Sequence, residues 1–179
     1  MPRKPIIARV EADGGGSSET DAPERAQLRE ALARWASGVA VVATRMDGQL
    51  TAMTASAFMA LSLEPPLVAV AVGEQAPLAA LLQEGTSFGV SILARDQRRL
   101  AGIFADAFAV DSSGFSADDG GRPPLLLSAL AGLACRVTAL HFAGDHHLVL
   151  AAVEGVRLGD ARMPLIYYDR AYRGLEGGE

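Results

Sequence analysis

A run of small and hydroxylated residues stands where one predicted strand ends. Residues 53–58 read Met-Thr-Ala-Ser-Ala-Phe, and another hydroxyl follows at Ser62, shortly before Pro65-Pro66. Small side chains at a strand end let backbone amides and hydroxyls approach a flat polar ligand closely. The alternative is an ordinary turn whose hydroxyls bond to the local backbone. The spacing by itself leaves both interpretations open.

A second cluster, Gly144-Asp145-His146-His147, lies between two predicted strands. A zinc site needs three or four converging ligands, whereas adjacent residues of a strand point to opposite faces, so this pair argues against a metal. His146 could instead donate a hydrogen bond to a polar heterocycle or stack on it. The alternative is a plain Gly-Asp turn in which a histidine satisfies backbone groups.

Aromatic rings alternate with guanidinium groups over residues 167–173, near the end of the chain. Such a segment can stack on a base or hold a phosphate. It can equally be an amphipathic edge strand whose tyrosine hydroxyls face water. Arg98 and Arg99, in a predicted helix, offer a similar choice between a ligand phosphate and a solvated helix face.

The composition excludes several classes of protein. The 179 residues suffice for one domain with a sizeable core. With 15 arginines, one lysine and 21 acidic residues the net charge is −5, which predicts no nucleic-acid partner. No apolar run approaches the ~18 residues of a membrane-spanning helix, and the early apolar stretch is too short for a secretory leader. We therefore expect a cytoplasmic protein that does not bind membranes.

The single cysteine and the missing motifs narrow the chemistry further. Cys135 cannot form an internal disulfide, and we expect it to be a small buried side chain. The sequence lacks the glycine-rich phosphate loops and the Gly-x-Ser-x-Gly turn, so neither a Rossmann site nor a hydrolase nucleophile is supported.

The elements that must position these clusters are mostly strands. Residues 1–23 predict a disordered tail before a domain over 24–175. A helix is expected to begin near Pro23, with Leu28, Leu32 and Trp35 on its apolar face and Gly38 at its end. Further strands are predicted at 38–44, 49–54, 67–72, 88–93, 133–142, 147–158 and 165–168, further helices at 77–82 and 96–104, and an irregular loop at 106–124. Many short strands with few helices favour a barrel.

Taken in order, these segments resemble one known family. The matching stretches are Leu32–Val42, Met53–Phe58, Ser62–Val68, Phe88–Leu93, Gly144–His146 and Pro164–Tyr168. They resemble the short-chain NAD(P)H:flavin oxidoreductases, the flavin reductase components of two-component flavin monooxygenases. The resemblance covers about 150 residues, which is the size of a whole domain. It implies an FMN-binding split β-barrel of Greek-key type.

The resemblance also implies an activity and a set of site residues. Hydride would pass from NAD(P)H to FMN or FAD, and the reduced flavin would supply a partner monooxygenase, with the reductase a homodimer. His146 would be the catalytic residue that seats the nicotinamide, and no metal would be needed. The implied cofactor-binding residues are Met53, Thr54, Ala55, Ser56, Ser62, Leu63, Gln75, Ser91, Arg99, Asp145 and Tyr172. The alternatives are a non-catalytic flavin-binding or electron-carrier barrel, and a barrel that binds another planar ligand.

Three positions depart from the family's pattern. Glu74 stands near the expected flavin phosphate, which a carboxylate would repel. Ala107 precedes Phe108 where a basic residue is common, and Ala171 stands where a glycine is common. The first two bear on the choice between FMN and FAD.

Overall fold

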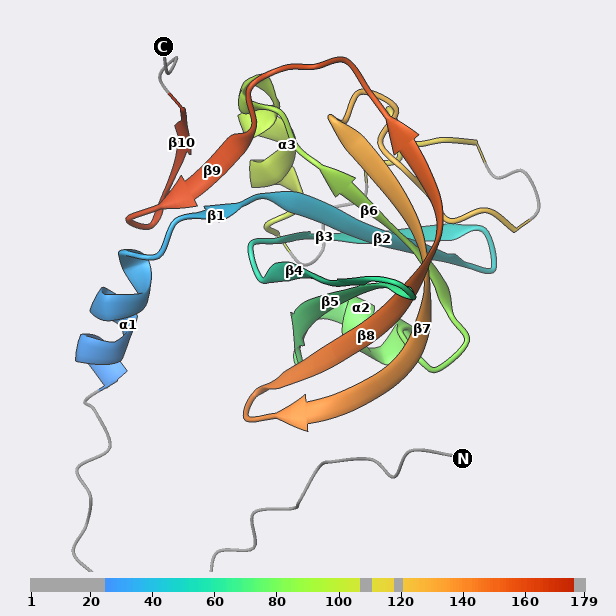
Figure 1. Ribbon diagram of the computed structural model, residues 1–179, viewed down its shortest axis with the longest axis horizontal. Helices are drawn as coiled ribbons and strands as arrows, with labels where there is room; N and C mark the ends of the chain where they lie inside the picture. Colours follow the sequence, from blue (N-terminus) through green and yellow to red (C-terminus); the bar gives the residue numbers. More distant parts are fainter. Residues whose placement is uncertain (1–24, 107–110, 118–120, 176–179) are drawn as a thin grey trace, which may run out of the picture. The chain divides into compact units, whose positions relative to one another are not determined.

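The computed structural model describes residues 25–106, 111–117 and 121–175 (Figure 1). The chain divides into two units, Met1–Leu32 and Ala33–Glu179. The predicted tail over 1–23, together with Ala107 and Phe108, lies outside the described residues.

The first helix, α1, is shorter than expected. It spans Arg25–Ala33 and has no buried residue. The prediction that Trp35 continues its apolar face and that Gly38 ends it is wrong. The Ala33 carbonyl instead accepts a hydrogen bond from the Asp169 N–H, and Gly38 already belongs to a strand. Pairing with a strand far along the chain has therefore overridden the local helical pattern.

The second unit is built mainly of antiparallel strands. Its strands are β1 (Ser37–Gly38), β2 (Ala40–Met46), β3 (Gln49–Ala55), β4 (Phe58–Leu63), β5 (Pro66–Gly73), β6 (Ser87–Ile92), β7 (Ala131–Ala143), β8 (His146–Leu158), β9 (Leu165–Tyr168) and β10 (Ala171–Gly174). Its helices are α2 (Pro77–Leu81), the 3₁₀ turn η1 (Arg95–Gln97) and α3 (Arg98–Ile103). Among the described residues no helix is long and apolar enough to cross a membrane.

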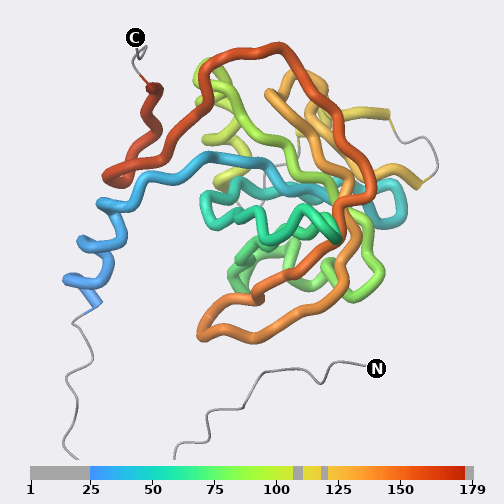
Figure 2. The backbone as a smooth tube through the Cα atoms, viewed as in Figure 1, coloured from blue at the N-terminus to red at the C-terminus, as the bar shows by residue number. Residues whose placement is uncertain are grey.

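Seven strands form one curved sheet in the order β3-β2-β6-β7-β8-β5-β4, and β1, β9 and β10 form a smaller one. The edge strands β3 and β4 are consecutive in the chain and are joined by Ser56–Ala57, whose Ala57 carbonyl accepts from the Ala71 N–H of β5. The two edges therefore approach each other at this corner. β7 and β8 form a long hairpin that bends along its length (Figures 1 and 2), with register shifts near Cys135 and Thr138.

Strand β2 separates two apolar cores, which explains why both its faces are apolar. Val42 packs inside the curved sheet with Phe88, Val70 and Leu78. Val41, one residue earlier, points to the other face and belongs to the second core. That second core also contains Leu93, Phe104, Phe115, Leu126 and Leu165.

Most of the predicted strands are confirmed, as is the hairpin at Asp47-Gly48, where both residues have positive φ. The predicted helix at 96–104 is divided into η1 and α3. Three strands were not predicted as separate elements. The first part of the predicted strand at 38–44 begins as the short β1, and β4 follows the hydroxyl-rich run 53–58, with which it shares only Phe58. The third, β10, pairs with β9 in the segment for which an edge strand was the alternative.

The irregular segment before β7 packs closely against the sheet at two glycines. A Cβ on Gly89 would lie 2.0 Å from the Pro124 carbonyl oxygen, and one on Gly132 would lie 3.0 Å from Leu125. Phe115 is buried and meets the Phe104 ring edge-on at 5.6 Å. The predicted loop therefore contributes to the core through its described part.

Candidate active site

The turn between β7 and β8 presents His146 beside its own Asp145. Gly144 has a φ of +64°, which closes the turn, and Asp145 and His146 follow. The His146 Nδ1 lies 2.7 Å from an Asp145 carboxylate oxygen, and the two side chains are 47% and 87% exposed. The carboxylate thus orients the imidazole and leaves it accessible from solvent.

The His146 ring lies next to the end of β5. His146 pairs with Gly73 in the sheet, and a Cβ on Gly73 would come within 3.7 Å of the His146 Nε2. The Glu74 N–H donates to the Asp145 carbonyl at 3.0 Å. Gln75 follows on the exposed turn. The structure therefore brings together three of the predicted residues, His146, Asp145 and Gln75, together with Glu74.

Thr54 and Tyr172 converge on one backbone carbonyl. The Thr54 hydroxyl donates to the Ala101 carbonyl at 2.8 Å, and the Tyr172 hydroxyl donates to the same oxygen at 3.3 Å. The Thr54 N–H also donates to the Phe104 carbonyl at 2.7 Å. Both hydrogens that Thr54 can donate are therefore used inside the protein. These bonds tie the end of β3 to α3 and to the C-terminal hairpin.

The residues around Thr54 differ in how far their side chains are exposed. Ser56 is exposed at the corner after β3, whereas Ala55 is buried and Met53 packs against the core inside the sheet. Ser56 is thus the member of this cluster whose hydroxyl is exposed at the surface.

Tyr172 is also held by its neighbours in the hairpin. Its ring meets Tyr167 edge-on at 5.7 Å. Burial raises the pKa of Tyr172, the nearby Tyr167 adds to this, and the Arg98 charge opposes it. The left-handed residues of this hairpin are Asp169 and Arg170, whereas Ala171, where a glycine was expected from the family's pattern, lies in β10.

Ser62 and Leu63 lie away from the His146 turn within one chain. They pair with Leu67 and Pro66, at the opposite end of β5 from Gly73. Seven residues of strand span roughly 23 Å. Ser62 accepts a hydrogen bond from the Glu64 N–H, and Leu63 is 94% exposed.

Ser91 and Arg99 occupy contrasting positions. Ser91 is buried, and its hydroxyl accepts a hydrogen bond from the Leu126 N–H at 2.9 Å. Arg99 is exposed on α3 and lines a pocket of about 430 Å³ together with Asp111. Ser91 therefore fixes the segment before β7, whereas Arg99 can reach a ligand.

Phe142 was not singled out from the sequence. It precedes the turn, is 83% exposed, and meets the His147 ring edge-on at 4.6 Å. The signal available in the sequence was an aromatic residue just before a Gly-Asp turn. Within the described ranges, no three histidine, cysteine or acidic side chains cluster as metal ligands would.

Known proteins with a similar sequence point to one family. The flavin reductase like domain matches residues 32–176. The reductase component of 4-hydroxyphenylacetate 3-monooxygenase from Thermus thermophilus is 46% identical over 148 residues, covering 83% of this chain and 95% of the relative. An NADH-dependent flavin reductase from Rhodococcus is 41% identical over 153 residues, covering 83% and 85%.

A solved structure has the same fold. The NADH:FAD oxidoreductase of Streptomyces globisporus, in complex with NAD and FAD fragments, superposes with a TM-score of 0.79 at 30% identity, covering 89% of this chain and 98% of that one. The open seven-stranded sheet is thus the split barrel expected from the sequence. The chain belongs to the flavin reductase like family.

Proposed function

We propose that this protein is an NADH-dependent flavin reductase that reduces FMN or FAD and supplies the reduced flavin to a partner monooxygenase. The observation that carries the proposal is the exposed His146–Asp145 pair beside Gly73, in a chain of this family. Relatives named as NADH-dependent reductases and as a monooxygenase component support the donor and the partner.

The residues around the turn suit nucleotide binding. A flavin, when bound, accepts a hydride from the nicotinamide, so the protein's task is mainly to orient the two rings. The glycine at position 73 leaves the backbone of β5 open beside the His146 ring. We assign His146, oriented by Asp145, to the nicotinamide, and Gln75 to a neighbouring polar group. Exposed Ser56 would contact the flavin edge, and Arg99 a nucleotide phosphate.

The other predicted residues position these groups. Thr54 and Tyr172 hold the corner after β3 through the Ala101 carbonyl. Met53 and Ala55 pack beneath it, and Ser91 fixes the segment at Leu126. No side chain here needs to be a strong acid or base for hydride transfer.

A flavin carrier without turnover is the second candidate function. Glu74, beside the His146 turn, is the feature that favours it, because a carboxylate repels phosphate. A carrier, however, has no use for an accessible histidine at a nicotinamide site. We therefore prefer the reductase, and we propose a cytoplasmic location for it.

We further propose that two copies associate through the outer face of β4, β5 and β8. Val68 and Val70 point into the core, so their neighbours point outward. Met59, Ala69 and Leu150 lie side by side across the three strands on that outer face. Other outward residues in the register are Leu67, Ala71, Leu148 and Ala152. An apolar face of this kind is typical of an interface between subunits.

In such a dimer, Ser62 and Leu63 could contact nucleotides bound to the other copy, which they do not reach within one chain. Ser62 pairs with Leu67 at the outer face, far from its own His146 turn. A second copy seated on this face would bring Ser62 and Leu63 near the partner's nucleotides.

The reductase is tested by following NADH oxidation in air with FMN, with FAD and without flavin. We expect oxidation that requires both protein and flavin and is proportional to the protein concentration. Flavin binding measured by fluorescence, with no NADH oxidation above the protein-free rate, would favour the carrier instead.

A further inference from the structure

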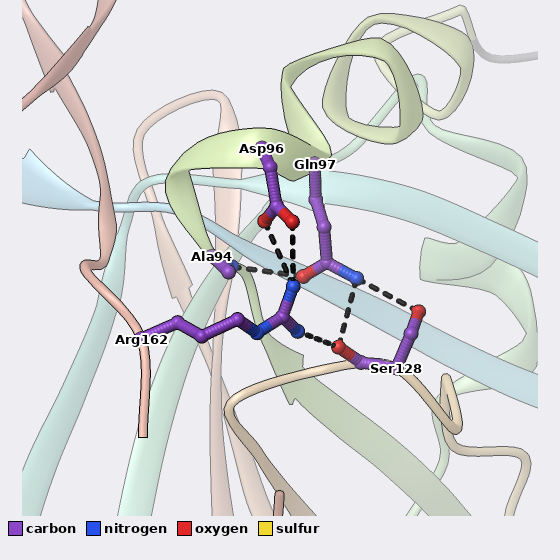
Figure 3. Close-up of polar contacts among 5 residues, drawn as sticks. All are labelled: Ala94, Asp96, Gln97, Ser128 and Arg162. Atoms are coloured by element: carbon purple, nitrogen blue, oxygen red, sulfur yellow. Dashed lines mark hydrogen bonds and ion pairs between the residues drawn. The ribbon is translucent and has the colours of Figure 1, made fainter. Parts of the chain in front are cut away.

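A pocket on the side of α3 is separate from the His146 turn and has a rigid wall. Gln97 is buried; its carbonyl accepts from the Ala94 N–H at 2.8 Å, and its amide donates to the Ser128 hydroxyl at 2.8 Å (Figure 3). Arg162 donates to both carboxylate oxygens of Asp96, at 2.7 and 2.9 Å, and to the Ser128 carbonyl. These bonds fix η1 and the segment before β9 against the Ser128 turn.

The rest of the lining offers three kinds of chemistry in one place. Leu100 and Ile103 supply an apolar surface, and Ser113 and Asp111 supply polar groups. Arg99 supplies a cation. Arg162 is already paired with Asp96, whereas Arg99 is exposed and its charge acts on the Asp111 carboxylate. Arg99 is therefore the cation that can take up an anionic ligand.

The ionisation state of Asp111 suits a ligand whose hydroxyls donate hydrogen bonds. Hydrogen bonds from Ser113 lower the pKa of Asp111, and the Arg99 charge lowers it further. Asp111 is thus an ionised carboxylate that accepts hydrogen bonds. The carboxylate suits the hydroxyls of a ribose, the neighbouring cation suits a phosphate, and the apolar surface suits a flat base.

The pocket has the size and position for one half of a dinucleotide. Its volume of about 430 Å³ lies within the range of small-molecule sites. Thr54 contacts the C-terminal end of α3 at Ala101 and Phe104, and the pocket lies on the side of the same helix. A helix is only about 10 Å wide, a distance that a dinucleotide can span.

We infer that this pocket binds the adenosine monophosphate group of a dinucleotide, with Arg99 at the phosphate, Asp111 at the ribose and Leu100 and Ile103 against the base. The inference rests on the proposed function, because both FAD and NADH carry this group while FMN does not. It predicts that the protein distinguishes FAD or NADH from ligands that lack adenosine.

The test uses AMP as the probe. Calorimetry gives the Kd of AMP, fluorescence quenching gives the Kd of FMN and FAD, and initial rates with FMN give the KM for NADH. The variants are Arg99→Ala and Asp111→Asn, and the matched control is Arg98→Ala, which removes the neighbouring charge on the Tyr172 side of α3.

We expect AMP to bind the wild type and to leave the Kd of FMN unchanged. AMP should also raise either the apparent Kd of FAD or the KM for NADH. Which of the two rises shows whether the adenosine group in this pocket belongs to FAD or to NADH. Arg99→Ala and Asp111→Asn should weaken AMP binding about tenfold, and Arg98→Ala should not. The inference is overturned if AMP does not bind, if inorganic phosphate competes as well as AMP, or if Arg99→Ala weakens FMN and FAD equally. Failure of FMN reduction would instead refute the proposed function, and the calorimetric result would still decide the pocket.

Discussion

At the scale of single residues, His146 is the group whose removal separates nicotinamide binding from flavin binding. It is accessible, it is oriented by Asp145, and it contributes nothing to the described cores. His146→Ala should raise the KM for NADH by about three- to tenfold, the value of one or two hydrogen bonds. The Kd of flavin should stay within about twofold.

Asp145→Asn provides the graded comparison for this prediction, because it keeps the shape of the turn and removes the orienting charge. We expect its KM for NADH to lie between those of the wild type and His146→Ala. A loss of flavin affinity in His146→Ala, with the KM for NADH unchanged, would contradict the role assigned to His146.

Cys135 allows a second test at this scale. Burial raises the pKa of its thiol to about 12, and the Glu154 charge adds to this. At about pH 8 almost none of the thiol is ionised, and the thiolate is the reactive form. The folded protein should therefore not react with a thiol reagent such as DTNB, and one equivalent should react after unfolding in guanidinium. Rapid labelling of the folded protein would show that this strand opens locally.

At the scale of elements, the contact between β6 and the segment before β7 is the least tolerant of change. Gly89→Ala would place a methyl group 2.0 Å from the Pro124 carbonyl oxygen, within a backbone that cannot move independently. We expect a loss of about 2–4 kcal/mol in the free energy of unfolding.

Gly102→Ala is the matched control for this glycine. Gly102 lies in α3 and a Cβ there would meet nothing within 4 Å, so alanine should stabilise the protein by about 0.5–1 kcal/mol. Denaturant titration of the two variants measures both changes in the free energy of unfolding. Equal effects of the two substitutions would show that the Pro124 segment does not press on β6.

In the turn between β9 and β10, a substitution is expected to stabilise the fold. Asp169 and Arg170 have φ values of +49° and +58°, a conformation that costs most side chains about 1–2 kcal/mol. Arg170→Gly should therefore raise the midpoint of denaturant unfolding. A lower midpoint would mean that the Arg170 side chain makes contacts that outweigh the strain.

At the scale of the whole molecule, the outer face of β4, β5 and β8 is expected to join two copies. Leu150→Asp places a charge at the centre of this face and should convert the dimer to a monomer in sedimentation equilibrium. Leu158→Asp, at the exposed far end of the same strand, is the control and should leave the mass unchanged. A dimer that survives Leu150→Asp and dissociates with Leu158→Asp would place the interface elsewhere.

Local patterns were enough to predict much of this molecule, and distant contacts were not. The hairpin at Asp47-Gly48 follows from two residues, and β5 follows from an apolar run after two prolines. β4 was missed because Phe58–Leu63 lacks a clean alternation of apolar and polar residues. The partner of Thr54, Ala101, lies 47 residues away, so its role as a tie to α3 could not be predicted from its neighbours.

Anaerobic rapid mixing of the protein, FMN or FAD, and NADH tests the central claim most directly. Loss of flavin absorbance and loss of NADH should proceed at the same rate and in equal amounts, in proportion to the protein, and deuterium at the transferred position of NADH should slow both. Flavin that binds but keeps its colour in the presence of NADH would contradict the assignment of this protein as a reductase.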